Sequence, residues 1–329
     1  MIDVMVGETQ FVDHCASIFL ALPPEQRGTF IAHRSIAGRA REWGIPVTGL
    51  IADSDNPVLV ASYSDQKRAR RLGRTRIARV EHGAGQSYHA DPKFGGNSSY
   101  AGGRDCGDVS LFLCPNDYSA DRWQASYPGA RVEVIGCAKL DSLPARVPGD
   151  GPVCAVSFHF DINIIPETRW AWPTYKPVLP DLAKAYKVIG HGHPKGIGML
   201  DRYYARMGIE VVPDFADVCR RADLYVMDNS STLFEFAATG RPVVVLNDPG
   251  FRRNVNHGLR FWEAADVGVQ VNRPQDLVAA VAEALEDAPE RKAAREAALG
   301  IAYAYRSGGA QRAADALVDW ASAVRAVAA

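Results

Sequence analysis

The sequence has no excess of charge of either sign and no long apolar run. Its 37 Lys and Arg residues are balanced by 38 Asp and Glu residues, which gives a formal net charge of −1. No global basic field is available to hold nucleic acid or an anionic membrane surface, so polyanion binding would need a local patch. No hydrophobic run approaches the ~18–20 residues that a membrane-spanning helix requires. These absences argue against binding of nucleic acid through overall charge and predict no membrane span.

Cysteines are few and scattered, with no CxxC pair: Cys15, Cys106, Cys114, Cys137, Cys154 and Cys219. Most stand in or beside apolar runs, which is typical of reduced core residues rather than of disulfide bridges or zinc ligands. The N-terminal stretch MIDVMVGETQ has no basic region and soon meets acidic and polar residues, unlike a secretory signal. We therefore expect a cytoplasmic protein.

The composition is that of an ordinary folded enzyme or binding protein. Hydrophobic residues make up 47% of the chain and charged residues 23%, which excludes disordered, fibrous and coiled-coil classes. A length of 329 residues predicts two domains at roughly 100–200 residues each. No internal repeat interrupts this pattern, and the only biased segment is an alanine-rich tail that favours helix.

Residues 1–147 alternate short apolar runs with helix-like stretches, the pattern of βα units around a parallel sheet. The predicted strands are 2–6, 29–33, 46–51, 57–62, 77–81, 109–114 and 131–136. The stretch from Pro144 to Pro152 is rich in Pro and Gly and predicts an interdomain linker. We therefore expect an N-terminal Rossmann-like domain over 1–147 and a C-terminal one over 148–329.

The same alternation restarts in the second half, with predicted strands at 152–158, 187–191, 209–213, 223–227 and 241–247. Two helices near the C-terminus carry apolar stripes: Leu277, Val281 and Leu285 after Pro274 on one, and Leu317, Trp320, Val324 and Val327 on the last. We assign both helices to the C-terminal domain as packing elements. The predicted fold is α/β, with two doubly wound domains facing a cleft. Because open α/β sheets bind ligands beyond the carboxyl ends of their strands, functional residues are expected in the loops that follow strands.

The first such loop follows the predicted strand 77–81 and begins with His82-Gly83 before a glycine-rich run. Imidazole titrates near neutrality, and glycines let a ligand approach the backbone, so His82 is a candidate general base. A turn or capping histidine is the alternative.

The second loop, Gly190-His191-Gly192-His193-Pro194-Lys195, follows an apolar strand. Its histidines and Lys195 could neutralise a diphosphate. A metal ion shared by His191 and His193 is less favoured, because no carboxylate or third histidine stands at a matched spacing. A polar turn before a helix is the remaining alternative.

The third loop follows the predicted strand 223–227 and contains Asp228, Ser230, Ser231 and Thr232 before a helix. Free N–H groups and the helix dipole make such a turn an anion site, to which the hydroxyl groups add donors. Thr232 with Glu235 also fits a capping box, and the two interpretations are compatible. Four residues after the next strand could lie near the same cleft: Arg252, Arg253, Asn254 and His257.

Four motifs in this order resemble those of the CDP-glycerol:glycerophosphotransferases, which build teichoic-acid-like polymers and have the GT-B fold. They are His82-Gly83, Gly136-Cys137-Ala138-Lys139-Leu140-Asp141, His193-Pro194, and Asp228-Asn229-Ser230-Ser231 with Glu235. The family patterns are His-Gly, Gly-x-Pro-Arg-x-Asp, His-Pro, and Asp-Tyr-Ser-Ser with a following acidic residue. The resemblance covers roughly residues 77–250 and is most specific in the last motif.

The resemblance implies an inverting transferase that moves glycerol phosphate, or a related polyol phosphate, from a CDP donor to an acceptor hydroxyl. It implies that His82 deprotonates the acceptor and that Glu235 binds ribose. The donor phosphates would be held by His193, Lys195, Ser230, Ser231 and Thr232, with Gly83, Lys139, Asp141 and Asp228 in support. The scheme needs no metal, because cationic side chains and a helix N-terminus replace it. It also needs no cofactor, since the CDP- or UDP-linked donor is itself a substrate.

The sequence departs from the family at two places. Ala84 and Gln86-Ser87 stand where the family has Thr and a following Lys, and Lys139 replaces the arginine. The chain also lacks the amphipathic additions expected of an enzyme on lipid-linked acceptors, which favours a soluble acceptor or a single addition. Three alternatives therefore stay open: a nucleotide-sugar glycosyltransferase, a UDP-sugar epimerase-like enzyme, and a degenerate family member that only binds nucleotide.

Overall fold

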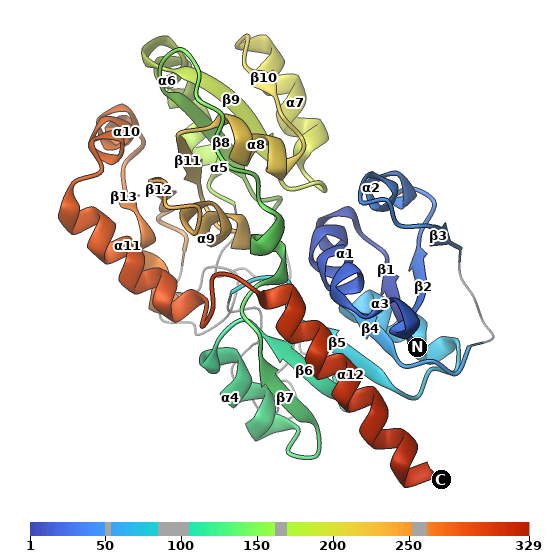
Figure 1. Cartoon of the computed structure of the whole chain (residues 1–329). Coiled ribbons are helices and arrows are strands. Elements are labelled where there is room, and N and C mark those ends of the chain that lie inside the picture. The colour runs from blue at the N-terminus through green and yellow to red at the C-terminus, as the bar shows by residue number, and fades with distance from the viewer. Residues whose placement is uncertain (50–53, 85–104, 162–169, 252–261, 329) are drawn as a thin grey trace. The chain divides into compact units, whose positions relative to one another are not determined.

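The computed structural model describes residues 1–49, 54–84, 105–161, 170–251 and 262–328 (Figure 1). The chain divides into two compact units, the first made of Met1–Ser142 with Tyr303–Ala329, and the second of Leu143–Ala302. Each unit is built around one parallel β-sheet with helices between the strands, as the alternating sequence pattern predicts.

The first unit holds a seven-stranded sheet in the order β3-β2-β1-β4-β5-β6-β7. Its strands are β1 (Ile2–Val6), β2 (Arg27–Ala32), β3 (Val47–Thr48), β4 (Val58–Val60), β5 (Ile77–Val80), β6 (Val109–Cys114) and β7 (Arg131–Val134). All neighbours pair in parallel. Every residue of β1 is buried, as expected of a parallel strand with helices on both faces.

The helices of the first unit are α1 (Val12–Ala21), α2 (Ala37–Glu42), α3 (Tyr63–Arg71), α4 (Asp117–Ser126) and α12 (Gly309–Ala328), with short 3-10 turns η1 (Thr9–Phe11), η2 (Pro24–Gln26) and η4 (Ala138–Ser142). One core joins alternate β1 residues, such as Val4, to α1 and α12. A second core on the opposite face contains Met5, Phe112 and Trp123. The period-two alternation along β1 thus supplies both layers.

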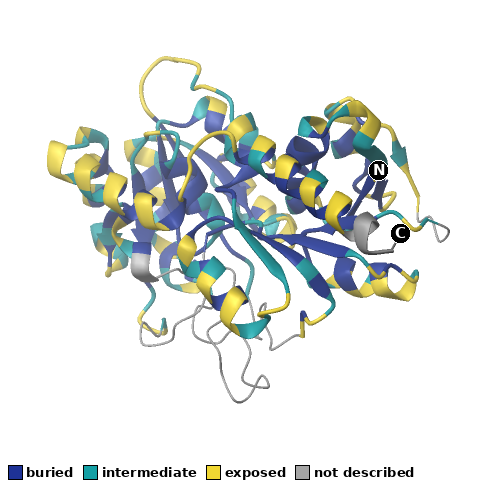
Figure 2. Cartoon of the chain, turned by 60° about the horizontal axis from the view of Figure 1, so that its bottom comes forward, coloured by how far each residue is buried: buried dark blue, intermediate teal, exposed yellow. Residues whose placement is uncertain are grey.

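The second unit holds a six-stranded sheet in the order β10-β9-β8-β11-β12-β13. Its strands are β8 (Val153–Phe158), β9 (Lys187–Gly192), β10 (Glu210–Val211), β11 (Leu224–Met227), β12 (Val243–Leu246) and β13 (Val269–Val271). Its helices are α5 (Trp172–Tyr175), α6 (Leu179–Ala185), α7 (Ile197–Arg206), α8 (Phe215–Arg221), α9 (Ser231–Ala237), α10 (Leu277–Glu286) and α11 (Pro289–Ala302), with 3-10 turns η6 (Lys176–Val178), η7 (Trp262–Val267) and η8 (Pro274–Asp276). Figure 2 shows the strands as buried and the outward faces of the helices as exposed.

Both sheets reverse their strand order at one point. In the first sheet, β1 lies between β2 and β4, and in the second sheet β8 lies between β9 and β11. Ligands of open α/β sheets bind outside the carboxyl ends of the strands at such a switch point. The β1/β4 ends and the β8/β11 ends are therefore where functional side chains should gather in the two units.

The last helix corrects the predicted domain assignment. The sequence analysis placed it in the C-terminal domain, whereas α12 belongs to the first unit. Its apolar stripe, with Leu317 and Trp320, packs into the same core as Ile18 of α1. The units divide between Ser142 and Leu143, just before the Pro- and Gly-rich stretch rather than inside it. An amphipathic stripe shows that a helix needs a partner surface but does not say which one.

Two further expectations concern the whole chain. Across the part that the structure describes, no helix combines the length and apolar character needed to cross a bilayer. All six cysteines are buried and free, as expected of reduced core residues.

Candidate functional site

Asp228 organises the switch point of the second unit. The residue directly follows β11 and is completely buried. Its Oδ1 accepts the N–H groups of His159 at 2.9 Å and Asn229 at 2.7 Å, and its Oδ2 accepts the N–H of Ala171 at 2.9 Å. The carboxylate thus fixes the residue after β8, the residue before α5 and the turn after β11. Three N–H donors around one carboxylate are the arrangement that stabilises its charged form.

The loop after β9 brings a histidine and a lysine to this point. The His193 N–H donates to the Phe158 carbonyl at the end of β8, with a distance of 3.2 Å. The Lys195 N–H donates to Nδ1 of His193 at 3.1 Å, so the neutral ring carries its proton on Nε2. An Nε2–H donor beside the exposed Lys195 is suited to phosphate oxygens. His191, in contrast, is buried and its Nδ1 is 2.8 Å from the Val212 carbonyl, which is a structural role.

His159 is a functional candidate that the sequence analysis missed. It lies directly after β8, and its ring centroid is 4.7 Å from that of His193. Its Nδ1 is 3.0 Å from the Phe160 carbonyl, which can only accept, so the neutral ring has its lone pair on Nε2. Burial is the main cause that lowers the pKa of His159 to about 4, with a smaller contribution from Lys195. The signal that points to His82, a histidine directly after a buried strand, is present here too.

The pKa of His159 predicts acid sensitivity of the fold. Its value in the folded protein, about 4, lies below the ordinary value of 6.5, so the unfolded chain binds a proton first as the pH falls. The contribution of the neutral His159 ring to the free energy of unfolding is fully present above pH 6.5 and is lost as the pH falls toward 4. At pH 5 this loss amounts to about 2 kcal/mol.

Denaturant unfolding at pH 7 and pH 5 measures this loss. His159→Gln should reduce the difference between the two pH values, because it removes the titrating ring. His33→Gln is the matched control, since the His33 ring is exposed. An identical pH dependence in all three proteins would refute the contribution of His159.

The hydroxyl-rich turn caps α9 in a way that differs from the predicted capping box. Ser230, not Thr232, is the N-cap, and its Oγ accepts the Thr232 N–H at 3.3 Å. The Thr232 hydroxyl donates to the Ser230 Oγ at 3.1 Å and lies 3.2 Å from the hydroxyl of the buried Tyr225. These contacts hold the capping side chain of Ser230 in place. Ser230 and Ser231 are half-buried, and Glu235 of α9 is fully buried. The hydroxyl groups of Ser230 and Ser231 are therefore the ones that a ligand could reach, and the Thr232 hydroxyl stabilises Ser230.

His82 lies at the switch point of the first unit. Its Nδ1 is 3.1 Å from the carbonyl of Ala61, which follows β4, and its ring centroid is 4.3 Å from that of Phe11, which leads into α1. A carbonyl only accepts, so Nδ1 carries the proton and the lone pair is on Nε2. This is the tautomer that a general base needs when its Nε2 receives the proton. Gly83, the next residue, is buried.

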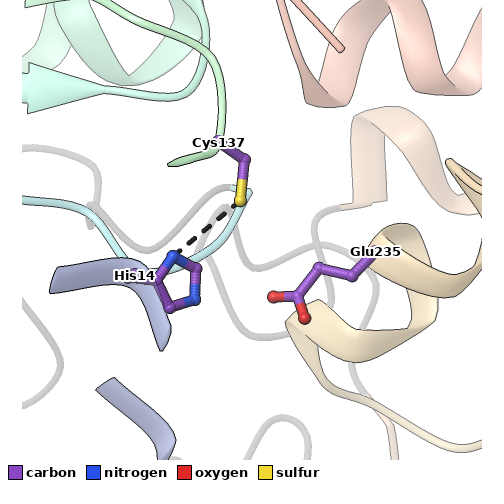
Figure 3. Close-up of side chains that lie close together, drawn as sticks. All are labelled: His14, Cys137 and Glu235. Carbon is purple, nitrogen blue, oxygen red and sulfur yellow. Dashed lines mark hydrogen bonds between the residues drawn. The ribbon is translucent and has the colours of Figure 1, made fainter. Parts of the chain in front are cut away.

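His14 of α1 is a second candidate that the sequence did not indicate. It is 2% exposed, its ring centroid is 6.4 Å from that of His82, and its Nδ1 is 3.8 Å from Sγ of Cys137 (Figure 3). Burial, then the charges of Lys139 and His82, hold the pKa of His14 well below its ordinary value. Lys139, a predicted supporting residue, is also buried and thus belongs to this group in the first unit. Glu235, drawn in the same figure, belongs to α9 of the second unit.

The rest of the Gly136–Asp141 motif holds the C-terminal segment. Asp141 accepts the N–H groups of Gly308 at 2.6 Å and Ala310 at 2.8 Å, which caps the start of α12. Gly136 has a φ of +80° and leaves no room for a side chain, because a Cβ would lie 2.4 Å from the Tyr305 carbonyl oxygen. Asp141, predicted as a supporting site residue, is thus a helix-capping residue.

The structure gathers the predicted residues into two groups. His82, Gly83 and Lys139 lie in the first unit, and Asp228, His193, Lys195, Ser230, Ser231, Thr232 and Glu235 lie in the second. The glycine-rich run after residue 84, including Gln86 and Ser87, and the residues Arg252, Arg253, Asn254 and His257 lie outside the described residues.

No protein-family model matches the sequence, and a search of curated proteins found no match. Solved structures match nearly the whole chain. A Listeria monocytogenes protein assigned as a UDP-N-acetylglucosamine 2-epimerase has a TM-score of 0.66 at 15% identity, with 97% of this chain and 95% of that chain covered. The wall teichoic acid polymerase TagF has a TM-score of 0.64 at 14% identity, with 98% and 89% covered.

A third structure, the UDP-GlcNAc 2-epimerase of Neisseria meningitidis bound to UDP-GlcNAc, has a TM-score of 0.59 at 13% identity, with 97% and 98% covered. At such identities the likeness shows the fold alone. The two parallel sheets and their alternating helices match the Rossmann-like units of these proteins, so the chain has the GT-B fold that its motifs predicted.

Proposed function

We propose that this protein is an enzyme that acts on a nucleotide-diphosphate-linked substrate. We further propose that it transfers glycerol phosphate, or a related polyol phosphate, from a CDP donor to an acceptor hydroxyl. The observation that carries the proposal is the β8/β11 switch point of the second unit. There Asp228 fixes three chain segments by their N–H groups, and His193 and Lys195 come from the neighbouring loop.

The second unit binds the donor in this proposal. The Nε2–H of His193, the ammonium of Lys195 and the hydroxyl groups of Ser230 and Ser231 donate to the diphosphate. Asp228 fixes the turn after β11 that carries Ser230 and Ser231, and the His193 N–H is held by the Phe158 carbonyl, so these donors are preorganised before any ligand arrives. Thr232 supports Ser230 from behind, and Glu235 binds ribose hydroxyl groups.

The first unit supplies the base. Nε2 of His82 removes the proton from the acceptor hydroxyl while the acceptor oxygen attacks the phosphorus that carries the glycerol. A new P–O bond forms, the bond between this phosphorus and the bridging oxygen breaks, and CMP leaves. The Ala61 carbonyl holds the Nδ1 proton and stabilises the imidazolium that forms.

A second candidate is an enzyme for a UDP-linked sugar, either an epimerase or a glycosyltransferase. It is supported by the two UDP-N-acetylglucosamine 2-epimerase structures, whose TM-scores of 0.66 and 0.59 bracket the 0.64 of TagF. Lys139 in place of the arginine of the CDP-glycerol family also favours it.

Thermal stabilisation by CMP, CDP, CDP-glycerol, UDP and UDP-GlcNAc at equal concentration tests both candidates. A ligand at ~100 times its Kd adds about 2.7 kcal/mol to the folded state, which gives a visible rise in Tm. Selective stabilisation by the cytidine ligands is expected. Selective stabilisation by uridine ligands would favour the second candidate, and no response to any ligand would contradict both.

Two variants localise the binding. Lys195→Gln should weaken the stabilisation by the diphosphates more than that by CMP, because the lost charge faces a second phosphate. Lys184→Gln is the matched control, since Lys184 is exposed and pairs with Asp181 on α6. Product analysis then separates the reactions, with CMP released by phosphopolyol transfer and UDP by sugar transfer. Nucleotide binding without turnover of CDP-glycerol or UDP-GlcNAc would favour the degenerate binding protein.

A further inference from the structure

The C-terminal segment is anchored to the loop that carries Cys137 and Lys139. Asp141 caps the start of α12 by accepting two N–H groups, from Gly308 and Ala310. From α12, Arg312 donates its Nε–H to the Ile135 carbonyl at 3.1 Å. The chain is thus held at Ile135, before η4, and at Asp141, within η4, by residues that lie more than 160 positions later.

Gly309 lies in close contact with the backbone of this loop. A Cβ at Gly309 would lie 2.9 Å from the carbonyl carbon of Cys137 and 3.0 Å from the nitrogen of Ala138. Both of these atoms belong to the backbone, so any larger residue would displace the loop. The position of Cys137 is therefore set by the first residue of α12.

Cys137 in turn contacts His14, whose Nδ1 is 3.8 Å from the Cys137 Sγ. His14 belongs to α1, and α1 packs against both α12 and η4. The C-terminal helix therefore fixes both partners of this contact, the thiol through Gly309 and the histidine through the shared core of Ile18, Leu317 and Trp320.

The rings of His14 and Phe11 both adjoin the ring of His82. The His14 centroid is 6.4 Å from that of His82 with the planes at 77°, and the Phe11 centroid is 4.3 Å away. Phe11 and His14 lie on adjacent turns of the chain, in η1 and at the start of α1. Movement of His14 would therefore also move the surface against which His82 packs.

We propose that His14 is a positioning residue for His82, and that the C-terminal segment fixes it through Cys137. The proposal rests on the proposed role of His82 as the general base. His14 does not touch the substrate in this scheme. It keeps the His82 ring in the orientation in which Nε2 faces the acceptor hydroxyl, while the Ala61 carbonyl accepts the hydrogen bond from Nδ1–H. The C-terminal helix is then part of the catalytic unit rather than only a packing element.

Four variants and one control test the proposal. Gly309→Ala displaces the Cys137 backbone, Cys137→Ala removes the thiol, and His14→Leu removes the ring. His14→Asn keeps a polar atom near the place of Nδ1 and should preserve the contact with Cys137. Gly300→Ala is the matched control, because Gly300 lies in the helix α11 and a Cβ there meets nothing within 4 Å.

Two readouts are used on the full chain: the ring resonances of His82 in histidine-labelled protein, and the kcat and KM for CDP-glycerol and UDP-GlcNAc. Gly309→Ala, Cys137→Ala and His14→Leu should shift the His82 resonances. They should lower kcat on the order of 10–100-fold with KM nearly unchanged, because a small misplacement of a reacting group is that costly. His14→Asn keeps a polar atom for Cys137 but loses the ring beside His82, so its kcat should be as low as that of His14→Leu, whereas Gly300→Ala should match the wild type.

Folded Cys137→Ala and His14→Leu proteins with unchanged His82 resonances and unchanged kcat would overturn the proposal. Wild-type kcat in His14→Asn would also contradict it, because the ring beside His82 would then be irrelevant. If the wild type turns over neither substrate, the proposed function fails. The coupling is then judged from the His82 resonances alone, where a shift supports the positioning role and no shift refutes it.

Discussion

Replacement of His82 by Ala is expected to lower turnover on the order of 10²–10⁴-fold while the affinity for nucleotide stays nearly unchanged. The reason is the position of the ring. Its Nδ1–H donates to the Ala61 carbonyl, so Nε2 is the atom that takes the proton from the hydroxyl group of the acceptor substrate. The groups proposed to bind the donor phosphates, such as His193 and Lys195, belong to the other unit. Loss of the base should therefore affect kcat and not the Kd for CMP or CDP.

His82→Asn separates proton transfer from packing. The Asn side chain can donate to the Ala61 carbonyl as Nδ1 does, but it has no atom that accepts a proton near neutral pH. We expect its turnover to be as low as that of His82→Ala, with a stability closer to the wild type. Calorimetric titration with CMP and initial rates with saturating donor provide the two measurements. Wild-type turnover in both variants would show that His82 is not the base.

The fold was largely predictable, because buried parallel strands leave a strong signal in the sequence. The twelve predicted strands are all present as β1 to β12. β13 (Val269–Val271) was missed, although Val267, Val269 and Val271 alternate with Gly268 and Gln270 in the sequence. The assignment of α12 to the wrong domain has a different cause. Its apolar stripe is compatible with many surfaces, and its actual partner α1 lies at the other end of the chain.

The candidate site was only partly predictable, for reasons that differ between residues. Asp228 directly follows β11 and His82 lies two residues after β5, so the general rule for parallel sheets is enough to find them. His159 has the same position after β8 and could have been found in the same way. His14 could not, because it lies inside an amphipathic helix and its contact partner Cys137 is 123 residues away. Only the folded chain shows that this histidine adjoins His82.

Asp228→Ala is expected to lower the free energy of unfolding by about 3–5 kcal/mol and to abolish stabilisation by nucleotides. The substitution leaves the N–H groups of His159, Asn229 and Ala171 without their acceptor. Each such buried donor costs about 1–3 kcal/mol when it finds no replacement. The loops after β8 and β11 then lose their common anchor, so the donors proposed to hold the diphosphate are no longer preorganised.

Asp228→Asn should not rescue the loss, although it has nearly the same shape. Both carboxylate oxygens accept N–H groups, Oδ1 from His159 and Asn229 and Oδ2 from Ala171. An amide has one oxygen, which accepts, and one NH₂ group, which donates. The NH₂ group would therefore point at a backbone N–H that also needs an acceptor. Asp181→Ala on α6 is the matched control, because this aspartate is exposed and a surface substitution there should change stability by less than about 0.5 kcal/mol.

Denaturant unfolding with and without CDP distinguishes the possible roles of Asp228. Lower stability together with loss of the CDP effect is the expected result, because one carboxylate then fixes both the fold and the binding loops. Equal stability of Asp228→Ala and Asp181→Ala, with the CDP effect intact, would show that the N–H groups find other acceptors. Loss of the CDP effect at unchanged stability would instead mean that Asp228 contacts the nucleotide itself, and the preorganised switch point would no longer explain binding.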